Sequence, residues 1–331
     1  TTGVNATVVT RAKISGINAA DTYSFTLQGK STNASTVNAT ISSTSNLTEL
    51  KDAINSVSGS TGITASLTED LSGINLVQNE GYDIIIGGMT AATTHTGLAS
   101  ITFANSGAAS NLTKTSHGLA VGDVVRYDIN TAGNNKGLAG LTDGMIYKVG
   151  TVADANTFTL TNIDGTALTY GKDNTDDGDA GNTFTKVNIV DVKTVSKSNS
   201  TGLLVDGDIT RLGGSASNDS MAIAGQVSLS SHKAFTVTPG ATTNHFNAAQ
   251  TTETASLKQV GDVDVSSQLG ATNALSVIDG AIAMTSEVRS EIGAANNRLE
   301  ATADNLTNIS VNIQRSLSSV EDANFASETS A

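Results

Sequence analysis

The stretch ALSVIDGAIAMTSEVRSEIGAANNRLEATADNLTNISVNIQRSLSSVEDANFASETS, from Ala274 to Ser330, decides the fold class of this chain. One position recurs in it every seven residues, and six of its seven members are large and apolar. The members are Ile278, Thr285, Ile292, Leu299, Leu306, Ile313 and Val320. This spacing places the side chains on one face of an α-helix and predicts a coiled-coil-type helix from Thr272 to about Val320.

A second set of positions runs beside the first and is polar in its middle, so the pattern does not describe a simple two-stranded zipper. Its members are Leu275, Ile282, Arg289, Asn296, Ala303, Ser310 and Leu317. Val288, Ala295 and Ile309 widen the apolar face, as expected for a helix packed in a bundle. The residues predicted to pack in that bundle are Leu275, Ile278, Ile282, Ile292, Leu299, Leu306, Ile313, Leu317 and Val320.

The predicted helix is too long for a compact domain to bury. Its 49 residues would extend about 70 Å at a rise of ~1.5 Å each. Each large apolar side chain left in water forfeits about 1.5 to 3 kcal/mol. No second helical pattern of comparable length occurs in the sequence. The apolar face therefore predicts partner helices that this chain does not supply.

Residues 1–94 predict a β-rich module with one short helix. The run TYSFTLQ (Thr22–Gln28) alternates apolar and polar residues, which is typical of a half-buried strand. From Asn46 the pattern becomes helical, and we expect a capping box of Asn46 with Glu49 and a helix end at Gly59. The apolar face of this helix would be Leu47, Leu50, Ile54 and Val57.

Residues 95–197 predict a separate, inserted all-β domain, because long loops rich in Gly, Asn and Asp alternate with short β runs. The runs are DVVRY (Asp123–Tyr127), MIYKV (Met145–Val149) and TFTL (Thr157–Leu160). The segment HGLAVGDVV (His117–Val125) resembles small β-barrel modules of phage-tail and other surface proteins. Residues 198–261 predict a β-hairpin closed by Pro239-Gly240 and a connector, and residues 262–331 the long helix.

The C-terminal stretch closely resembles the C-terminal helix of bacterial flagellins. The matching motifs are NNRLE (Asn296–Glu300), NLTNIS (Asn305–Ser310) and VEDANFASETS (Val320–Ser330). The segment NLTELKDAINSVSGSTGITASLTEDLSGINLVQNEGYDIII (Asn46–Ile86) is similar to the helix-plus-strands module in the middle region of that family. GQVSLSSHKAFTV (Gly225–Val237) looks like its later β-hairpin. The resemblances follow the order of the family and cover roughly half of the chain.

The resemblance implies a structural subunit that self-assembles into the extracellular filament of the bacterial flagellum for motility. In the family this helix packs against N-terminal helices, and we expect those helices and the segment after Ala331 to be missing from this sequence. The implied partners are other flagellin subunits, an export chaperone and a filament cap. Arg289, Arg298 and Arg315 are candidates for contacts between subunits, with a solvated helix face as the alternative.

The composition argues against several classes of partner. The net charge of -13 and a pI near 4.6 disfavour nucleic acid and anionic membranes, which require clustered Lys and Arg. No apolar run approaches the length of a membrane span. The absence of Cys excludes disulfides, thiolate metal sites and Cys nucleophiles.

Few residues qualify as a chemical site. The histidines lie in separate predicted loops without metal-ligand spacing, and we interpret them as surface or turn residues: His95, His117, His232 and His245. In DNTDDGD, the residues Asp173, Asp177 and Asp179 approximate half of a calcium loop, but a solvated acidic turn is favoured because Phe184 stands where the loop requires Glu. We predict no catalytic residue, cofactor or metal, hence no enzyme, and O-linked glycans on exposed Ser or Thr of the inserted domain.

The predicted fold class is α+β: several antiparallel, β-rich modules followed by a long C-terminal coiled-coil-type helix. Two other functions remain open. A hook-filament junction protein shares the helical ends. A carbohydrate-binding adhesin or phage-tail-like surface protein would use the inserted domain as its active part and the helix as a stalk.

Overall fold

The structure is a computed structural model that describes residues 3–329 except 94, 96, 100–101, 104–110, 130–136, 172–181, 199–202, 214–219, 239–252 and 267. The chain divides into two compact units. The larger unit is Thr7–Ser228, and the smaller unit combines Thr1–Ala6 with Leu229–Ala331. The larger unit contains most of the β-strands, and the smaller unit contains the long helix.

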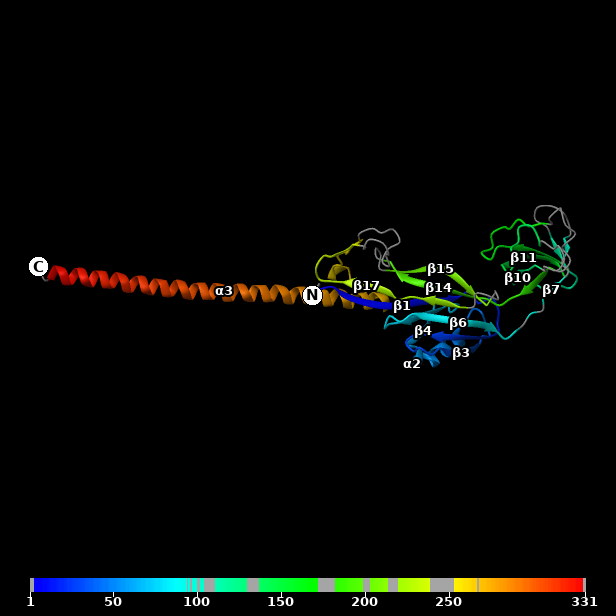
Figure 1. Ribbon diagram of the computed structural model, residues 1–331, viewed down its shortest axis with the longest axis horizontal. Coiled ribbons are helices and arrows are strands. Elements are labelled where there is room, and N and C mark those ends of the chain that lie inside the picture. Colours follow the sequence, from blue (N-terminus) through cyan, green and yellow to red (C-terminus); the bar gives the residue numbers. More distant parts are fainter. Residues whose placement is uncertain are drawn as a thin grey trace. The chain divides into compact units, whose positions relative to one another are not determined.

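Two sheets, called here the base sheets, form one part of the larger unit (Figure 1). The first has six strands in the order β15-β14-β1-β5-β4, with β17 paired to β1, and the second has four in the order β16-β6-β2-β3. The first sheet comprises β1 (Asn5–Ser15), β4 (Ile63–Leu67), β5 (Ile74–Gln78), β14 (Val190–Lys197), β15 (Leu204–Leu212) and β17 (Gln226–Ser230). The second comprises β2 (Thr22–Gln28), β3 (Ser35–Thr40), β6 (Ile84–Ala91) and β16 (Met221–Ile223).

One buried hydrophobic cluster joins both base sheets to helix α1 (Thr48–Ser56). The alternation predicted for β2 is confirmed, because its apolar side chains are the buried ones: Tyr23, Phe25 and Leu27. Ile14 of β1 and Leu50 of α1 belong to the same cluster and are at most 1% exposed. Burial of side chains of this size contributes about 1.5 to 3 kcal/mol each, so this cluster stabilises the two sheets and α1 as one layered core.

The ends of α1 differ from the prediction. Asn46 accepts a hydrogen bond from the backbone N–H two residues later, and Glu49 binds a serine hydroxyl in the preceding loop, so the capping box does not form. Gly59 does not end the helical segment, because helix α2 (Ser58–Thr61) follows α1. The segment ends at Gly62, whose φ of 69° is a left-handed conformation that glycine adopts without steric penalty.

The chain between β6 and β14 forms a third sheet, called here the inserted sheet (Leu98–Lys186). It has seven strands in the order β7-β13-β10-β11-β12-β9-β8, and each neighbouring pair is antiparallel. Its strands are β7 (Leu98–Ala99), β8 (Thr102–Phe103), β9 (Leu112–Thr113), β10 (Val124–Asp128), β11 (Ile146–Asp154), β12 (Thr157–Thr161) and β13 (Thr183–Lys186). The β runs predicted at Asp123–Tyr127, Met145–Val149 and Thr157–Leu160 correspond to β10, β11 and β12.

Three buried tyrosines stabilise the long connections of the inserted sheet. Each hydroxyl accepts a hydrogen bond from a backbone N–H, two of them in the connection between β10 and β11 and the third in strand β12. The pairs are Leu138 N with Tyr127 (2.7 Å), Thr142 N with Tyr147 (2.8 Å) and Leu160 N with Tyr170 (2.8 Å). A buried N–H without an acceptor costs about 1 to 3 kcal/mol, so these hydroxyls have a structural role.

The inserted sheet ends before the boundary that we predicted at Lys197. Its last strand, β13, ends at Lys186, and β14 pairs with β1 of the base, where Val192 lies opposite Ile14. Only Val187–Ile189 connects β13 with β14. Alternating burial marks β14 as a strand in either location, so the sequence pattern could not assign it to a sheet.

The predicted β-hairpin around residues 221–240 is wrong. β16 pairs with β6 and β17 pairs with β1, so these neighbouring segments join different sheets. β18 (Thr236–Val237) pairs instead with β19 (Glu253–Thr254). The predicted turn at Pro239-Gly240 lies outside the described residues.

The smaller unit is dominated by α3 (Gln268–Thr329), a helix of 62 residues preceded by the 3-10 turn η1 (Val260–Asp262) (Figure 1). At a rise of ~1.5 Å per residue it extends about 93 Å. It begins four residues before the predicted start at Thr272. The α+β fold class with a long terminal helix is confirmed, and the coiled-coil packing of α3 stays a prediction.

Candidate functional site

The residues predicted to pack in a bundle lie on α3 with largely exposed side chains. Their exposed fractions range from 42% for Ile278 to 68% for Leu299. The others lie between these values: Leu275, Ile282, Ile292, Leu306, Ile313, Leu317 and Val320. Removing such a side chain from water contributes about 1.5 to 3 kcal/mol, so this apolar stripe is a surface that gains free energy when it is covered.

Several polar side chains of α3 bond within the helix itself in the described part of the chain. The hydroxyls of Thr285, Thr302 and Thr307 donate to the carbonyl oxygens four residues earlier, at 2.7 to 2.9 Å. Gly280 and Gly293 have no neighbouring atom within 4 Å of the position that a Cβ would occupy. These glycines therefore mark open surface within this chain rather than sites of close helix packing.

The three arginines proposed for subunit contacts have different surroundings. Arg289 lines a shallow groove of about 310 Å³ beside the apolar stripe. The other lining residues are Val260, Ile278, Ala281, Ile282, Thr285 and Ser286. Among the described ion pairs, none involves Arg298 or Arg315, which lie farther along α3. A role of the three in subunit contacts stays a prediction.

A contact within the smaller unit that the sequence did not reveal holds a loop against α3. Glu287 binds His232 Nε2 at 3.0 Å and Lys233 Nζ at 2.5 Å. The Lys233 hydrogen bond, with a smaller contribution from His232, lowers the pKa of Glu287 against the opposing effect of burial. The partners lie more than 50 residues apart, so no local spacing indicated the contact.

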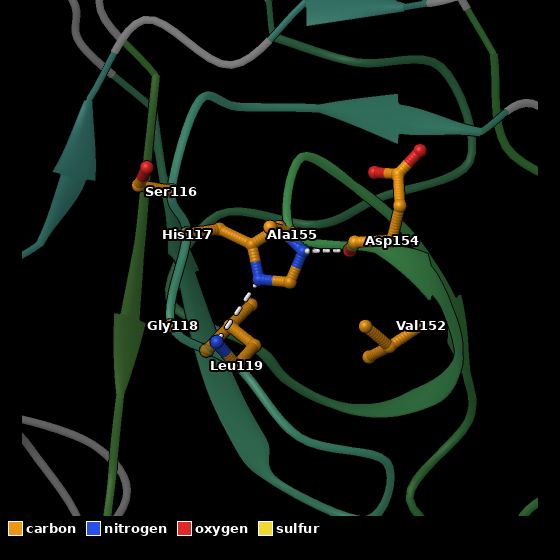
Figure 2. Close-up of a pocket in the computed structure, with 7 residues that line it drawn as sticks. All are labelled: Ser116, His117, Gly118, Leu119, Val152, Asp154 and Ala155. Atoms are coloured by element: carbon orange, nitrogen blue, oxygen red, sulfur yellow. Dashed lines mark hydrogen bonds between the residues drawn. The ribbon is translucent and has the colours of Figure 1, made fainter.

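His117 contradicts the prediction that the histidines are surface or turn residues, because it is only 5% exposed. Figure 2 shows its ring between the segment Ser116–Leu119 and the end of β11. Its Nδ1 accepts the backbone N–H of Leu119 at 2.9 Å. Nε2 therefore carries the proton and donates to the carbonyl oxygen of Asp154 at 3.2 Å.

The surroundings of His117 support a structural role. The imidazole contacts the ring of Phe158 at a centroid distance of 5.0 Å, and the open pocket beside it has a volume of about 320 Å³. Both ring nitrogens are already bonded to backbone groups, so neither a lone pair nor a proton is left for a ligand. The pocket consequently offers no general base or metal ligand through this histidine.

The remaining chemical candidates add no site. Across the described residues, no group of three or more His, Cys, Asp or Glu side chains could hold a metal ion. The predicted calcium-loop residues Asp173, Asp177 and Asp179 lie outside the described residues, as does His245. Within the same described part, no helix is both long and apolar enough to span a membrane.

Two family descriptions match segments of the chain. "Flagellin hook IN motif" matches residues 24–80, which run from β2 through α1 to the end of β5. "Bacterial flagellin C-terminal helical region" matches residues 275–331, which include most of α3. The second match coincides with the apolar stripe. The two matches and the similar proteins described next support a bacterial flagellin.

Individual flagellins are similar to this one over different lengths. The B-type flagellin of Pseudomonas aeruginosa is 30% identical over 222 residues, which are 63% of this chain and 43% of that protein. Flagellin A of Vibrio anguillarum is 41% identical and flagellin E of Vibrio cholerae 43% identical over 70 residues, which are 21% of this chain and 18% of each relative. This flagellin chain therefore spans less than half the length of the curated relatives it matches.

Proposed function

We propose that this flagellin chain is a structural subunit that polymerises with other flagellin subunits into the extracellular filament of the bacterial flagellum and so serves motility. The observation that carries the proposal is the apolar stripe of α3, whose nine residues are exposed from Leu275 to Val320. Its function is assembly, and the chain is not an enzyme. Flagellins are a structural protein family, which supports this reading.

The free energy of assembly would come from covering the apolar stripe with other helices in coiled-coil-type packing. The nine stripe residues are 42% to 68% exposed, so covering each one would contribute up to about 1.5 to 3 kcal/mol. The sum has to exceed the roughly 4 to 15 kcal/mol that association costs in lost freedom of motion. Arg289, Arg298 and Arg315 would add polar contacts between subunits. These contacts would select the register of neighbouring helices rather than supply most of the affinity.

Further partners follow from the same proposal. An export chaperone would cover the apolar stripe before assembly, because an exposed stripe of this kind invites premature association. A filament cap would act where subunits add. O-linked glycans would attach to exposed Ser or Thr of the inserted domain, and neither nucleic acid nor a membrane would be a partner.

The relatives named above favour the filament subunit over the two other functions left open by the sequence. All three are flagellins, and they include neither a hook-filament junction protein nor an adhesin. The match of residues 24–80 also falls on the base sheets, which gives the β-rich part of the chain a place in the same family.

The proposal is tested with the protein expressed from its complete gene. Leu299→Asn with Leu306→Asn inserts two amides into the apolar stripe, and electron microscopy should then show no filaments. Leu299→Met with Leu306→Met conserves volume and apolar character, so this matched control should polymerise. Filaments of normal length from the asparagine variant would contradict the proposal.

A further inference from the structure

Two connectors join the inserted sheet to the base sheets, one after β6 and one before β14. Both pass the turn at residues 16–21, which links β1 to β2. Strand register places four strand ends at this turn. Ser15 of β1 lies opposite Asp191 of β14, and the start of β2 pairs with the end of β6. The outgoing connector follows β6, and the returning connector is Val187–Ile189. The turn therefore lies where the inserted chain leaves and rejoins the base.

The carboxylate of Asp21 binds both connectors through one oxygen. Its Oδ2 accepts the backbone N–H of Thr93 in the outgoing connector at 3.0 Å and the side-chain amide of Asn188 in the returning connector at 2.7 Å. Its Oδ1 accepts the N–H of Thr22 at 2.7 Å, which fixes the carboxylate in position. Burial alone would raise the pKa of Asp21, but the hydrogen bonds led by that of Thr93 lower it. The charged, acceptor form of the carboxylate is thus favoured.

Asn18 binds the returning connector as a neighbouring β-strand would. Its Nδ2 donates to the carbonyl oxygen of Val187 at 3.0 Å, and its Oδ1 accepts the N–H of Ile189 at 2.8 Å. Gly213 lies close against the same connector, because a Cβ at this position would lie only 2.8 Å from the carbonyl oxygen of Asn188. Asn18 and Asp21 together therefore bind each of the three residues of the returning connector.

The returning connector also packs in the hydrophobic core, on the side of the inserted sheet and next to the core of the base sheets. Val187 and Ile189 pack with Val124 of the inserted sheet, and the N–H of Val187 donates to the carbonyl oxygen of Val124 at 2.9 Å. The next residue, Val190, is buried in the cluster of the base sheets. A rotation of the inserted sheet about this connector would break apolar packing as well as hydrogen bonds.

We propose that Asn18 and Asp21, the junction clamp, make the inserted sheet and the base sheets move as one body. Two covalent connectors alone would let an inserted domain pivot, whereas the junction clamp ties both of them to one turn of the base. The inserted sheet is then presented in a constant direction from the base. The proposal concerns only the larger unit, so it stands or falls independently of filament assembly.

Residual dipolar couplings of backbone amides test the proposal in the complete chain. In the unmodified protein, couplings from strands β10–β12 and from β1, β2 and β5 should fit one alignment tensor. In the double variant Asn18→Ala with Asp21→Ala, the magnitude of the alignment tensor fitted to the inserted sheet should fall by about twofold or more. The tensor fitted to the base sheets should stay unchanged. The control Asp208→Ala, at an exposed carboxylate of β15, should leave all couplings unchanged. Separate tensors in the unmodified protein, or unchanged couplings in the double variant, would overturn the proposal.

Amide hydrogen exchange provides a second test. It uses single variants, which should disturb folding less than the double variant does. Asp21→Asn keeps the side-chain shape but removes the charge, and exchange at Thr93 should accelerate about tenfold. Asn18→Ala should accelerate exchange at Ile189 by a similar factor. Exchange rates within twofold of the unmodified protein at both amides would show that the two side chains do not hold the connectors.

Discussion

Tyr127→Phe tests whether a tyrosine hydroxyl holds a long connection of the inserted sheet in place. The change keeps the buried ring and removes the oxygen that accepts the N–H of Leu138 at 2.7 Å. A buried N–H left without an acceptor costs about 1 to 3 kcal/mol. Because ~1.4 kcal/mol corresponds to a factor of ten, hydrogen exchange at Leu138 should accelerate about 5- to 140-fold.

Exchange measured by mass spectrometry or NMR suits this chain, because a protein with several domains does not unfold in one two-state step. Tyr82→Phe is the matched control, since the Tyr82 side chain is 46% exposed and its hydroxyl is replaceable by water. That variant should leave exchange throughout the inserted sheet unchanged. If Leu138 exchanges in Tyr127→Phe within twofold of the unmodified rate, the hydroxyl does not have the role assigned to it.

Three further predictions concern the core, the turns and the pH response. Phe158→Ala removes a fully buried ring and should destabilise the inserted sheet by about 3 to 5 kcal/mol. Hydrogen exchange should become faster in β10–β12 but not in the base sheets, and equal acceleration in the inserted sheet and the base sheets would contradict separate cores. Gly29→Ala should destabilise the base sheets, because a Cβ there meets the carbonyl oxygen of Thr61, whereas Gly59→Ala has open space and should be neutral or stabilising by up to ~1 kcal/mol, both measured by hydrogen exchange of the base sheets; the opposite order would refute the turn geometry. Glu287 has a lowered pKa, so its contact with the loop contributes its full stabilisation above pH 4.5, the ordinary pKa, and loses it as the pH falls through the lowered pKa. NMR titration of the carboxyl should show a pKa below 4.5, and Lys233→Met should return it toward 4.5.

Much of the fold could be predicted because local patterns determine it. The heptad spacing predicted α3 to within a few residues of its start, and alternation predicted β2 and the central strands of the inserted sheet. These patterns report which face of an element is buried. They do not report the partner that buries it, which explains the misplaced end of the inserted domain and the wrong hairpin at residues 221–240.

The contacts that escaped prediction join residues far apart in the chain. The lack of metal-ligand spacing predicts that His117 is a surface or turn residue. Spacing carries no information about the backbone groups that bond both of its nitrogens. Asp21 binds Asn188 across 167 positions, a separation at which spacing carries no signal. For the apolar stripe, the sequence predicted the residues and the structure shows that they are exposed. That other helices cover them stays a prediction.

Covering of the apolar stripe on assembly is the central claim, and a single introduced cysteine measures it directly because the chain contains no Cys. Leu299→Cys and, as control, Val121→Cys replace exposed residues of α3 and of the inserted domain, 68% and 64% exposed. In protein expressed from the complete gene, maleimide should modify both cysteines at similar rates before assembly. In filaments, Leu299→Cys should react at least about tenfold more slowly while Val121→Cys is unchanged. Equal reactivity of Leu299→Cys before and after assembly would contradict the account.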